Sequence, residues 1–377
     1  MGESVKGPSP ALWQQLQAVA QVMAGVGRGA STQVALDGLS PALRPGVQAL
    51  VFQVLRQWGR AQALRSQLVQ RAPPPLADAL LCSALALVWD TAHAPYEPHT
   101  LVSQTVEAAK RHKRLQGQST FLNACLRRFL REREALIAAT ANDGQARWNH
   151  PVWWIQRLQQ DHPDHWAAIL EANQIPGPMT LRVNTRRVSR DALQDRWQAQ
   201  GIVSHAVGVQ GLVLAVPMPV SQIPGFAQGD CSVQDAAAQC AAPLLLEGLA
   251  RSSDRPLRVL DACAAPGGKT AHLRELLHDD DALLALDIDP QRCKKIDDNL
   301  QRLGLSATVR TADAADVSSW WDGQPFDAVL LDAPCTASGI VRRHPDARWL
   351  RRETDVAQLA EIQRQLLLRL WPLVRPG

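Results

Sequence analysis

Short apolar runs and amphipathic stretches alternate along residues 258–370, and this alternation restricts the fold more than any other feature of the sequence. Such an order builds a parallel sheet, because each strand must be followed by a segment that crosses back to the other end of the sheet. Doubly wound sheets of this kind bind ligands at the carboxyl ends of their strands. We predict strands at 258–261, 282–287, 308–310 and 326–332, and helices at 268–277, 291–303 and 355–370.

Residues 11–136 show a different pattern, in which apolar side chains recur at every third or fourth position. This spacing predicts amphipathic helices, and breaks are expected at Pro41, at 73–75 and at Pro95. No alternating strand pattern appears between these breaks, so we predict an all-α domain of six or seven helices. It ends in a turn-rich stretch at 142–151, which we expect to have little to pack against.

Residues between these two regions mix both patterns. We predict helices near 154–160 and 191–200, strands at 179–184 and near Val203 and Leu212, a loop at 225–230, and a helix that begins near Ser232 with Gln234 and Asp235 in its first turn. The predicted architecture is therefore multidomain. It comprises an all-α domain at 1–145, a small α+β linker subdomain at 146–250 and an α/β Rossmann-like domain at 251–377.

The bulk composition predicts a globular cytoplasmic protein. No apolar run approaches the roughly 20 residues of a membrane span, and the first ten residues contain no apolar segment of a secretory signal. The seven cysteines are scattered and odd in number, which argues against a disulfide framework. The close pair His162 and His165 has no nearby cysteine, so we expect no metal site. Because no apolar run is long enough to span a membrane, we also expect no membrane partner.

Positive charge is concentrated in the N-terminal region, where residues 1–148 hold sixteen Lys and Arg against nine Asp and Glu. Clusters of this kind can meet several phosphates at once. An exposed, solvated helix face is the alternative interpretation. The candidate RNA-binding residues in these clusters are Lys110, Arg111, Lys113, Arg114, Arg127 and Arg128.

The loop after the first predicted strand runs Cys263-Ala264-Ala265-Pro266-Gly267-Gly268-Lys269. Its small residues and two glycines let the backbone approach a ligand closely. Asp287 closes the second strand, where a carboxylate can accept hydrogen bonds from both hydroxyls of a ribose. Asp313 follows the third strand and is placed to contact an adenine amino group. These residues predict a site for the methyl donor S-adenosyl-L-methionine.

A nucleotide triphosphatase is the rival interpretation of this loop. Gly268-Lys269-Thr270 resembles the end of a P-loop, and Asp332 after an apolar run could serve as its partner acid. The P-loop pattern requires glycine where this chain has Cys263, and Pro266 lacks the N–H that a phosphate cradle needs. The sequence therefore favours the methyl donor.

The fourth predicted strand ends in Asp332-Ala333-Pro334-Cys335, which places a thiol at the same edge as the loop. A lone cysteine is usually a small core residue, but Pro334 and the Thr-Ala-Ser-Gly sequence after Cys335 indicate exposure. A thiolate that adds to carbon 6 of cytosine makes carbon 5 nucleophilic enough to accept a methyl group. Asp332 can hydrogen-bond the N3 edge of a flipped base.

Cations and an aromatic ring follow this motif at Arg342, Arg343, His344 and Trp349. We interpret Arg343 and His344 as contacts for a flipped nucleotide or its phosphates, and Trp349 as an aromatic face for the base. An ordinary surface loop is the alternative. From the residues alone, Cys335 would be the nucleophile and Asp332 its partner.

In combination these motifs resemble the bacterial 16S rRNA cytosine-C5 methyltransferases of the RsmB or Sun type, within the NOL1/NOP2/Sun group. The resemblance covers nearly the whole chain. Its specific elements are CAAPGGK at 263–269, LDID at 286–289, FDAVLLDAPC at 326–335 and RRHPD at 342–346 with Trp349. Residues 102–111 and 121–128 resemble the NusB-like RNA-binding domain of this subfamily, and LRVN at 181–184 resembles its ferredoxin-like subdomain.

The resemblance implies a function for each part of the site. Residues 263–269, Asp287, Asp313 and Asp332 would line the S-adenosylmethionine site, and the substrate would be 16S rRNA or an early small-subunit precursor. In this family the attacking cysteine belongs to a later TCS motif, and the cysteine at the position of Cys335 assists product release.

The end of the sequence bears on this role. The chain ends at Gly377, where the strand before that motif is expected to begin. We therefore expect a C-terminally truncated methyltransferase domain without its nucleophile motif and last three strands. Donor binding would be weakened or lost, because strand 326–332 becomes an unpaired edge and part of the core is uncovered.

Three functions remain open from the sequence. The first is the methyltransferase, the second is a non-catalytic RNA-binding or antitermination-like module that retains a donor pocket, and the third is the triphosphatase. Methyl transfer to unmodified 16S rRNA separates the first two. Nucleotide binding separates the third, because only a triphosphatase binds ATP and fails to bind S-adenosylhomocysteine.

Overall fold

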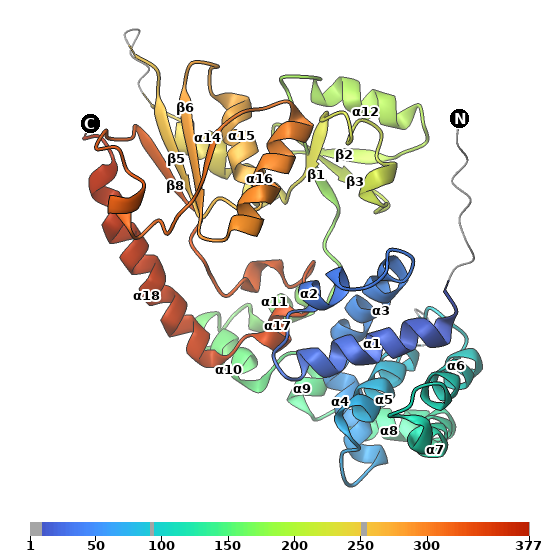
Figure 1. Ribbon diagram of the computed structural model, residues 1–377. Coiled ribbons are helices and arrows are strands. Elements are labelled where there is room, and N and C mark those ends of the chain that lie inside the picture. The colour runs from blue at the N-terminus through green and yellow to red at the C-terminus, as the bar shows by residue number, and fades with distance from the viewer. Residues whose placement is uncertain (1–9, 91–93, 250–254, 377) are drawn as a thin grey trace. The chain divides into compact units, whose positions relative to one another are not determined.

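The computed structural model describes residues 10–90, 94–249 and 255–376, which divide into two units (Figure 1). The first unit comprises residues 1–176 and 336–355, and the second comprises 177–335 and 356–377. Residues 1–9 and the predicted domain boundary at 250/251 lie outside the described residues.

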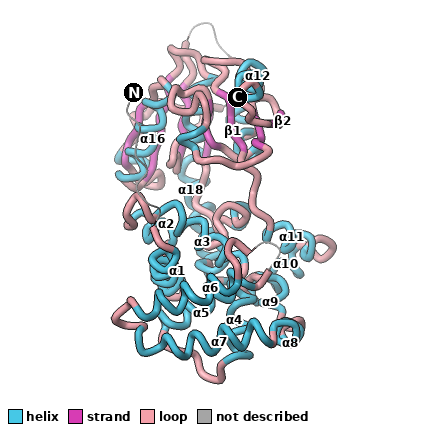
Figure 2. The backbone as a smooth tube through the Cα atoms, turned by 90° about the vertical axis from the view of Figure 1, so that its right-hand side faces the viewer, coloured by secondary structure: helices cyan, strands magenta, loops and turns pink. Residues whose placement is uncertain are grey.

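The described part of the first unit contains helices and no strand, as predicted (Figure 2). Eight helices instead of six or seven lie between residues 12 and 139, because the chain also breaks at Gln57 and Glu132, where neither Pro nor Gly signals a break. The helices before residue 176 are α1 (Leu12–Val26), α2 (Thr32–Asp37), α3 (Arg44–Arg56), α4 (Trp58–Leu68), α5 (Pro75–Val88), α6 (Pro98–Lys110), α7 (Ser119–Arg131), α8 (Arg133–Ala139), α9 (Gly144–Trp148), α10 (Val152–Asp161) and α11 (Trp166–Gln174).

Helix α5 forms the centre of this unit. Every residue from Ala79 to Val88 is buried, and a helix that is apolar on all sides must be surrounded by other elements. Helices α1, α3, α4, α6 and α7 pack around it. Pro75 begins the helix, where its missing N–H costs no intrahelical hydrogen bond.

The turn-rich stretch at 142–151 is largely buried from residue 146 onward, which contradicts the prediction that it has little to pack against. Asn149 is fully buried in the left-handed conformation at the end of α9. Its side-chain amide donates to the carbonyls of Leu55 (3.2 Å) and Arg56 (2.5 Å) and accepts from the N–H of Gly59 (2.8 Å). Asn149 therefore satisfies the backbone groups left open where α3 breaks into α4.

Residues 336–355 also belong to the first unit and carry a 3-10 turn at Ser338–Ile340 and α17 (Ala347–Leu350). Arg348 is fully buried and donates to the carbonyls of Asn149, Asn173 and Val341. Trp349 is half-buried against the helical core and was wrongly predicted to offer an aromatic face for a base. Packing against the helical core occupies this side chain instead.

The second unit begins with a four-stranded antiparallel sheet in the order β2-β3-β1-β4. The predicted start of the helix near Ser232 is wrong, because Ser232 lies in β4 and residues 231–233 pair with β1. The helix begins later, at Ala236, and Asp235 is its N-cap. The elements are β1 (Thr180–Val183), α12 (Arg190–Gln198), β2 (Ser204–Val207), β3 (Gly211–Leu214), β4 (Cys231–Val233), α13 (Ala236–Gln239) and α14 (Ala241–Leu246).

The predicted alternation after residue 258 forms a parallel sheet in the order β7-β6-β5-β8. Its elements are β5 (Arg258–Ala262), α15 (Gly268–Leu276), β6 (Ala282–Asp287), α16 (Pro290–Leu303), β7 (Thr308–Thr311), β8 (Ala328–Leu331) and α18 (Glu353–Leu370). Strand β8 is the edge of the sheet among the described residues, and beside it Phe326 forms a parallel bridge with Val374.

Both faces of this sheet are covered, as a doubly wound fold requires. Val259 and Leu283 pack with α14 and α15 on one face, whereas Leu260 and Leu286 pack with Leu366 on the other. Leu366 belongs to α18, which covers the second face. Within residues 10–90, 94–249 and 255–376, no helix combines the length and the apolarity that crossing a membrane requires.

Candidate active site

The loop between β5 and α15 lies at the carboxyl edge of the parallel sheet. Cys263 and Gly267 adopt positive φ angles of 62° and 91°. A Cβ atom on Gly267 would lie 3.0 Å from Cα of Ile296 in α16, so only glycine allows this close approach. The N–H of Ala264 donates to the carbonyl of Leu286 (2.8 Å), which ties the loop to the end of β6.

Asp287 is joined directly to this loop. Its carboxylate accepts hydrogen bonds from the N–H groups of Ala265 and Asp289, each at 3.1 Å, and the residue is 3% exposed. Arg292 lies 3.5 Å from the same carboxylate and donates to the carbonyl of Ala265. The acid is therefore held in one orientation at the strand end.

Three carboxylates converge on the loop. Burial, together with the nearby Asp287, Asp332 and Asp261, raises the pKa of Cys263 to about 11. Burial likewise raises the pKa of Asp261 to about 7, and its Oδ1 has no hydrogen-bond partner among the described residues. Lys269 and Arg292 lie beside these carboxylates, so charges of both signs line the loop.

Lys269 and Asp332 form an ion pair of 2.5 Å at the mouth of the loop. Asp332 follows β8, and its N–H donates to the carbonyl of Ala262 at 3.2 Å, so it belongs to the strand end next to the loop. Asp313 follows β7, and its carboxylate accepts from the N–H of Ala315. The structure thus brings Asp287 and Asp332 to the loop and leaves Asp313 two strands away from β5.

Cys335 is exposed a few residues beyond the end of β8. Ala262 and Leu331 are partners in the parallel register of β5 and β8, so the two strands end together. Gln363 of α18 donates to the carbonyl of Pro334 at 2.9 Å and fixes the backbone immediately before the thiol. The thiol therefore stands at the same sheet edge as the 263–269 loop.

The predicted RNA-binding residues fall into two groups within the helical unit. Arg343 and His344 lie on the 336–355 segment. The second group lies at the end of α6, in the following turn and on α7, and comprises Lys110, Arg111, Lys113, Arg114, Arg127 and Arg128. Within this group, Arg111 stacks over Trp13 at 4.8 Å and pairs with Glu107, and Arg128 pairs with Glu132. These ion pairs neutralise part of the positive charge of the group.

Arg182, which was not among the predicted site residues, lies in β1 and is fully buried. Its guanidinium forms a bidentate ion pair with Glu275 of α15 and donates to the carbonyl of Gly268 in the loop. The sequence offers one signal for it, a charged residue in the middle of an otherwise apolar strand.

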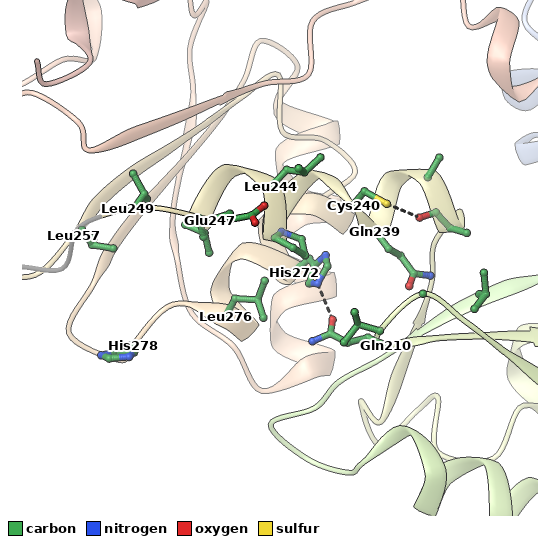
Figure 3. A pocket seen from close by; sticks show the side chains of 17 residues that line it. Gln210, Gln239, Cys240, Leu244, Glu247, Leu249, Leu257, His272, Leu276 and His278 are labelled. Carbon is green, nitrogen blue, oxygen red and sulfur yellow. Dashed lines mark hydrogen bonds between the residues drawn. The ribbon is translucent and has the colours of Figure 1, made fainter. Parts of the chain in front are cut away.

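A large pocket of about 1010 Å³ lies elsewhere, lined by residues of the β2–β3 turn, α13, α14 and α15 (Figure 3). His272 lines it, shares a hydrogen bond of 2.7 Å with Gln210, and has a pKa lowered to about 3 by burial. None of the predicted site residues lines this pocket. Beside it, His278, Asp280 and Asp281 are close enough to share a metal, but Asp281 already accepts from the N–H groups of Leu257 and His278.

Comparison with known proteins agrees with this arrangement. Residues 250–377 match the family described as 16S rRNA methyltransferase RsmB/F, and residues 150–221 match the ferredoxin-like domain of the RsmF/B-like methyltransferases. The chain is 39% identical over 357 residues to ribosomal RNA small subunit methyltransferase B of Vibrio cholerae, covering 93% of this chain and 80% of that protein.

Two solved structures share the fold. The crystal structure of PH0851 has a TM-score of 0.75 at 22% identity, with 99% of this chain and 85% of that one covered. The structure of NSun6 from Pyrococcus horikoshii with SFG has a TM-score of 0.52 at 19% identity, covering 60% and 81%. With the sequence match above, these findings establish that the chain belongs to the RsmB/F family of 16S rRNA methyltransferases.

Proposed function

We propose that this protein transfers a methyl group from S-adenosyl-L-methionine to carbon 5 of a cytosine in 16S rRNA. The observation that carries the proposal is Asp287, a buried acid held by the N–H of Ala265 in a glycine loop that shares its sheet edge with the exposed Cys335. An acid in this position suits a ribose diol, and a thiol at the neighbouring strand end suits addition to a pyrimidine.

The residues around the loop fit an adenosyl sulfonium ligand. The carboxyl groups of Asp261, Asp287 and Asp332 lie around the loop, and the bound donor supplies an electrophilic methyl group. The residues that would hold it are 263–269, Asp287, Asp313 and Asp332. Asp287 would bind the ribose hydroxyls and Asp313 the adenine amino group.

Two side chains would act on the cytosine. Asp332, paired with Lys269, would accept a hydrogen bond from the N4 amino group on the N3 edge of the flipped base. A thiolate adds to carbon 6, carbon 5 takes the methyl group, and loss of the carbon 5 proton expels the thiolate. By the family resemblance Cys335 assists this last step, and the attacking thiolate comes from the TCS motif.

The helical unit would deliver the RNA. We propose that residues 1–145 form a NusB-like domain, that 146–250 form the linking subdomain and that 251–377 form the catalytic domain. The basic residues at the end of α6 and on α7 would contact phosphates of 16S rRNA or its early small-subunit precursor. A ribosomal RNA substrate in a bacterium implies a cytoplasmic reaction.

The test is transfer of tritiated methyl groups to unmodified 16S rRNA by the protein expressed from its gene, with the modified position read by bisulfite sequencing. New 5-methylcytosine supports the proposal. Donor and RNA binding without transfer would instead favour the non-catalytic RNA-binding module. The Asp287→Asn variant should weaken donor binding about tenfold or more, because a charge-assisted hydrogen bond is worth about 1.5–3 kcal/mol.

A further inference from the structure

We propose that Arg182 is a positioning residue that holds the glycine loop in its donor-binding shape through the carbonyl oxygen of Gly268. The residue lies in the ferredoxin-like sheet, outside the strands that carry the reaction. This inference rests on the proposed function, because it concerns affinity for the same methyl donor.

The guanidinium of Arg182 donates hydrogen bonds to two residues of α15, Gly268 and Glu275. Nη1 donates to the carbonyl of Gly268 at 2.9 Å, and Nε and Nη2 donate to the carboxylate of Glu275 at 3.1 and 2.7 Å. Gly268 is the first residue of α15, and Glu275 lies near its other end. A single side chain therefore fixes the start of the helix, where the loop ends, relative to its body.

A second partner restrains the same guanidinium. Nη1 also donates to the side-chain oxygen of Gln234, whose own backbone N–H donates to the carbonyl of Thr180. A Cβ atom built on Gly268 would lie 3.8 Å from Nε2 of Gln234, so this amide packs directly against the loop. Gln234 and Glu275 together fix the orientation of the guanidinium. In this orientation Nη1 is directed toward the carbonyl of Gly268.

Stability alone does not explain this arrangement. The side chains of Arg182 and Glu275 are both fully buried, and the cost of removing two charges from water commonly cancels their attraction. An apolar pair of the same volume would support the fold equally well. What an apolar pair cannot do is place a rigid fork of donors against one particular carbonyl.

Arg186 provides a matched control because it binds the same helix at a different place. It donates to the carbonyls of Glu275 and Leu277 and pairs with Asp279, so it contacts the far end of α15. In the described part of the chain, no hydrogen bond or ion pair joins Arg186 to residues 263–268. Loss of Arg186 should therefore lower stability without changing the loop.

The experiment measures two quantities, the affinity for S-adenosylhomocysteine by calorimetry and the unfolding temperature. Four proteins are compared: the unmodified chain, Arg182→Lys, Arg186→Met, and the double variant Arg182→Met with Glu275→Leu. The double variant removes both charges and avoids an unpaired buried ion. We expect Arg182→Lys and the double variant to bind about tenfold more weakly, the double variant at near-normal unfolding temperature. Arg186→Met should lower the unfolding temperature and keep its affinity.

Three outcomes overturn the inference, and they are distinguishable. Normal affinity in both Arg182 variants would show that the Gly268 contact does not position the loop, while the proposed function stands. Absence of S-adenosylhomocysteine binding by the unmodified chain would overturn this inference, and the proposed function would fall with it only if methyl transfer to 16S rRNA also failed. Equal loss of affinity in Arg186→Met would show a general effect of destabilising α15.

Discussion

The indole Nε1 of Trp349 donates a hydrogen bond to the carbonyl oxygen of Leu55 at 3.0 Å. Leu55 lies in the last turn of α3, where Asn149 also binds the broken helix. The segment that follows Cys335 is therefore part of the helical unit's core. One role of the helical unit is to hold the chain that comes soon after the thiol.

Gly59→Ala should destabilise the helical unit. An added Cβ would lie 2.5 Å from the carbonyl oxygen of Gln145 and 3.2 Å from the ring of Trp349. Alanine gains about 1 kcal/mol in helix propensity, but overpacking costs about 1–3 kcal/mol, so a net loss is expected. Chemical unfolding measures it, with Gly117→Ala, which has open space around it, as control. Equal stability of the two variants would contradict this packing.

Asp261 should make stability fall as pH rises. Burial raises its pKa to about 7 in the folded protein, whereas the unfolded value is about 3.9. Between these values the folded state retains a proton that the unfolded state has released, so the contribution is complete below about pH 4 and lost as pH rises to about 7. A difference of one between the folded and unfolded pKa corresponds to about 1.4 kcal/mol of unfolding free energy.

Asp261→Asn should remove this pH dependence, because the amide stays neutral and can still accept the Thr270 hydrogen bond. The measurement is the free energy of unfolding by denaturant at several pH values from about 4 to about 8. Asp280→Asn, at an exposed position just before β6, is the control. Parallel curves for the unmodified protein and Asp261→Asn would refute the raised pKa.

Cys335→Ala distinguishes the two roles of the thiol. If Cys335 assists release, the variant of the protein expressed from its gene with the TCS motif should accumulate a covalent RNA–protein adduct, because the TCS thiolate still attacks, methyl transfer proceeds and elimination slows. If Cys335 is the attacking group, no adduct forms. We expect accumulation, measured on denaturing gels with tritiated donor. Cys240→Ala, the other exposed cysteine among the described residues, should behave as the unmodified protein.

Replacing Lys113 and Arg114 by alanine should weaken RNA binding nearly independently of sequence. Both side chains are exposed in the turn after α6, and removal of each phosphate contact should reduce the slope of log affinity against log salt by roughly 0.7–0.9. Filter binding to 16S rRNA fragments at several salt concentrations measures this. Arg28→Ala, an exposed arginine outside the cluster, should leave the slope unchanged. A slope in the double variant equal to that of the unmodified protein would exclude the cluster from the interface.

Local patterns were sufficient to predict the parallel sheet. The bounds of β6, 282–287, match the prediction, and β5, α15 and α16 lie within a residue or so of it. Glycine, proline and apolar periodicity determine these elements closely, so a single sequence reveals them. The short β4 was predicted as a helix because its pairing with β1, far earlier in the chain, leaves no local signal.

Contacts between distant residues account for what the sequence could not predict. Asn149 binds α3 from far along the chain, and Arg182 reaches Glu275 across a similar separation. The packing of Trp349 could not be predicted either, because its hydrogen-bond partner Leu55 is distant in sequence. The site residues at 263–269, Asp287 and Asp332 follow strand ends, which is why the topology of parallel sheets predicts their common edge.

Cys335 is the last residue of one unit before the chain passes at Thr336 into the other. Cys335 is thus close in sequence to the 336–355 segment, part of which packs in the helical core. Variants in α3 or α4 that disturb this core would then reduce catalysis. A genetic screen for inactive alleles should consequently recover lesions in the helical bundle alongside those in the loop.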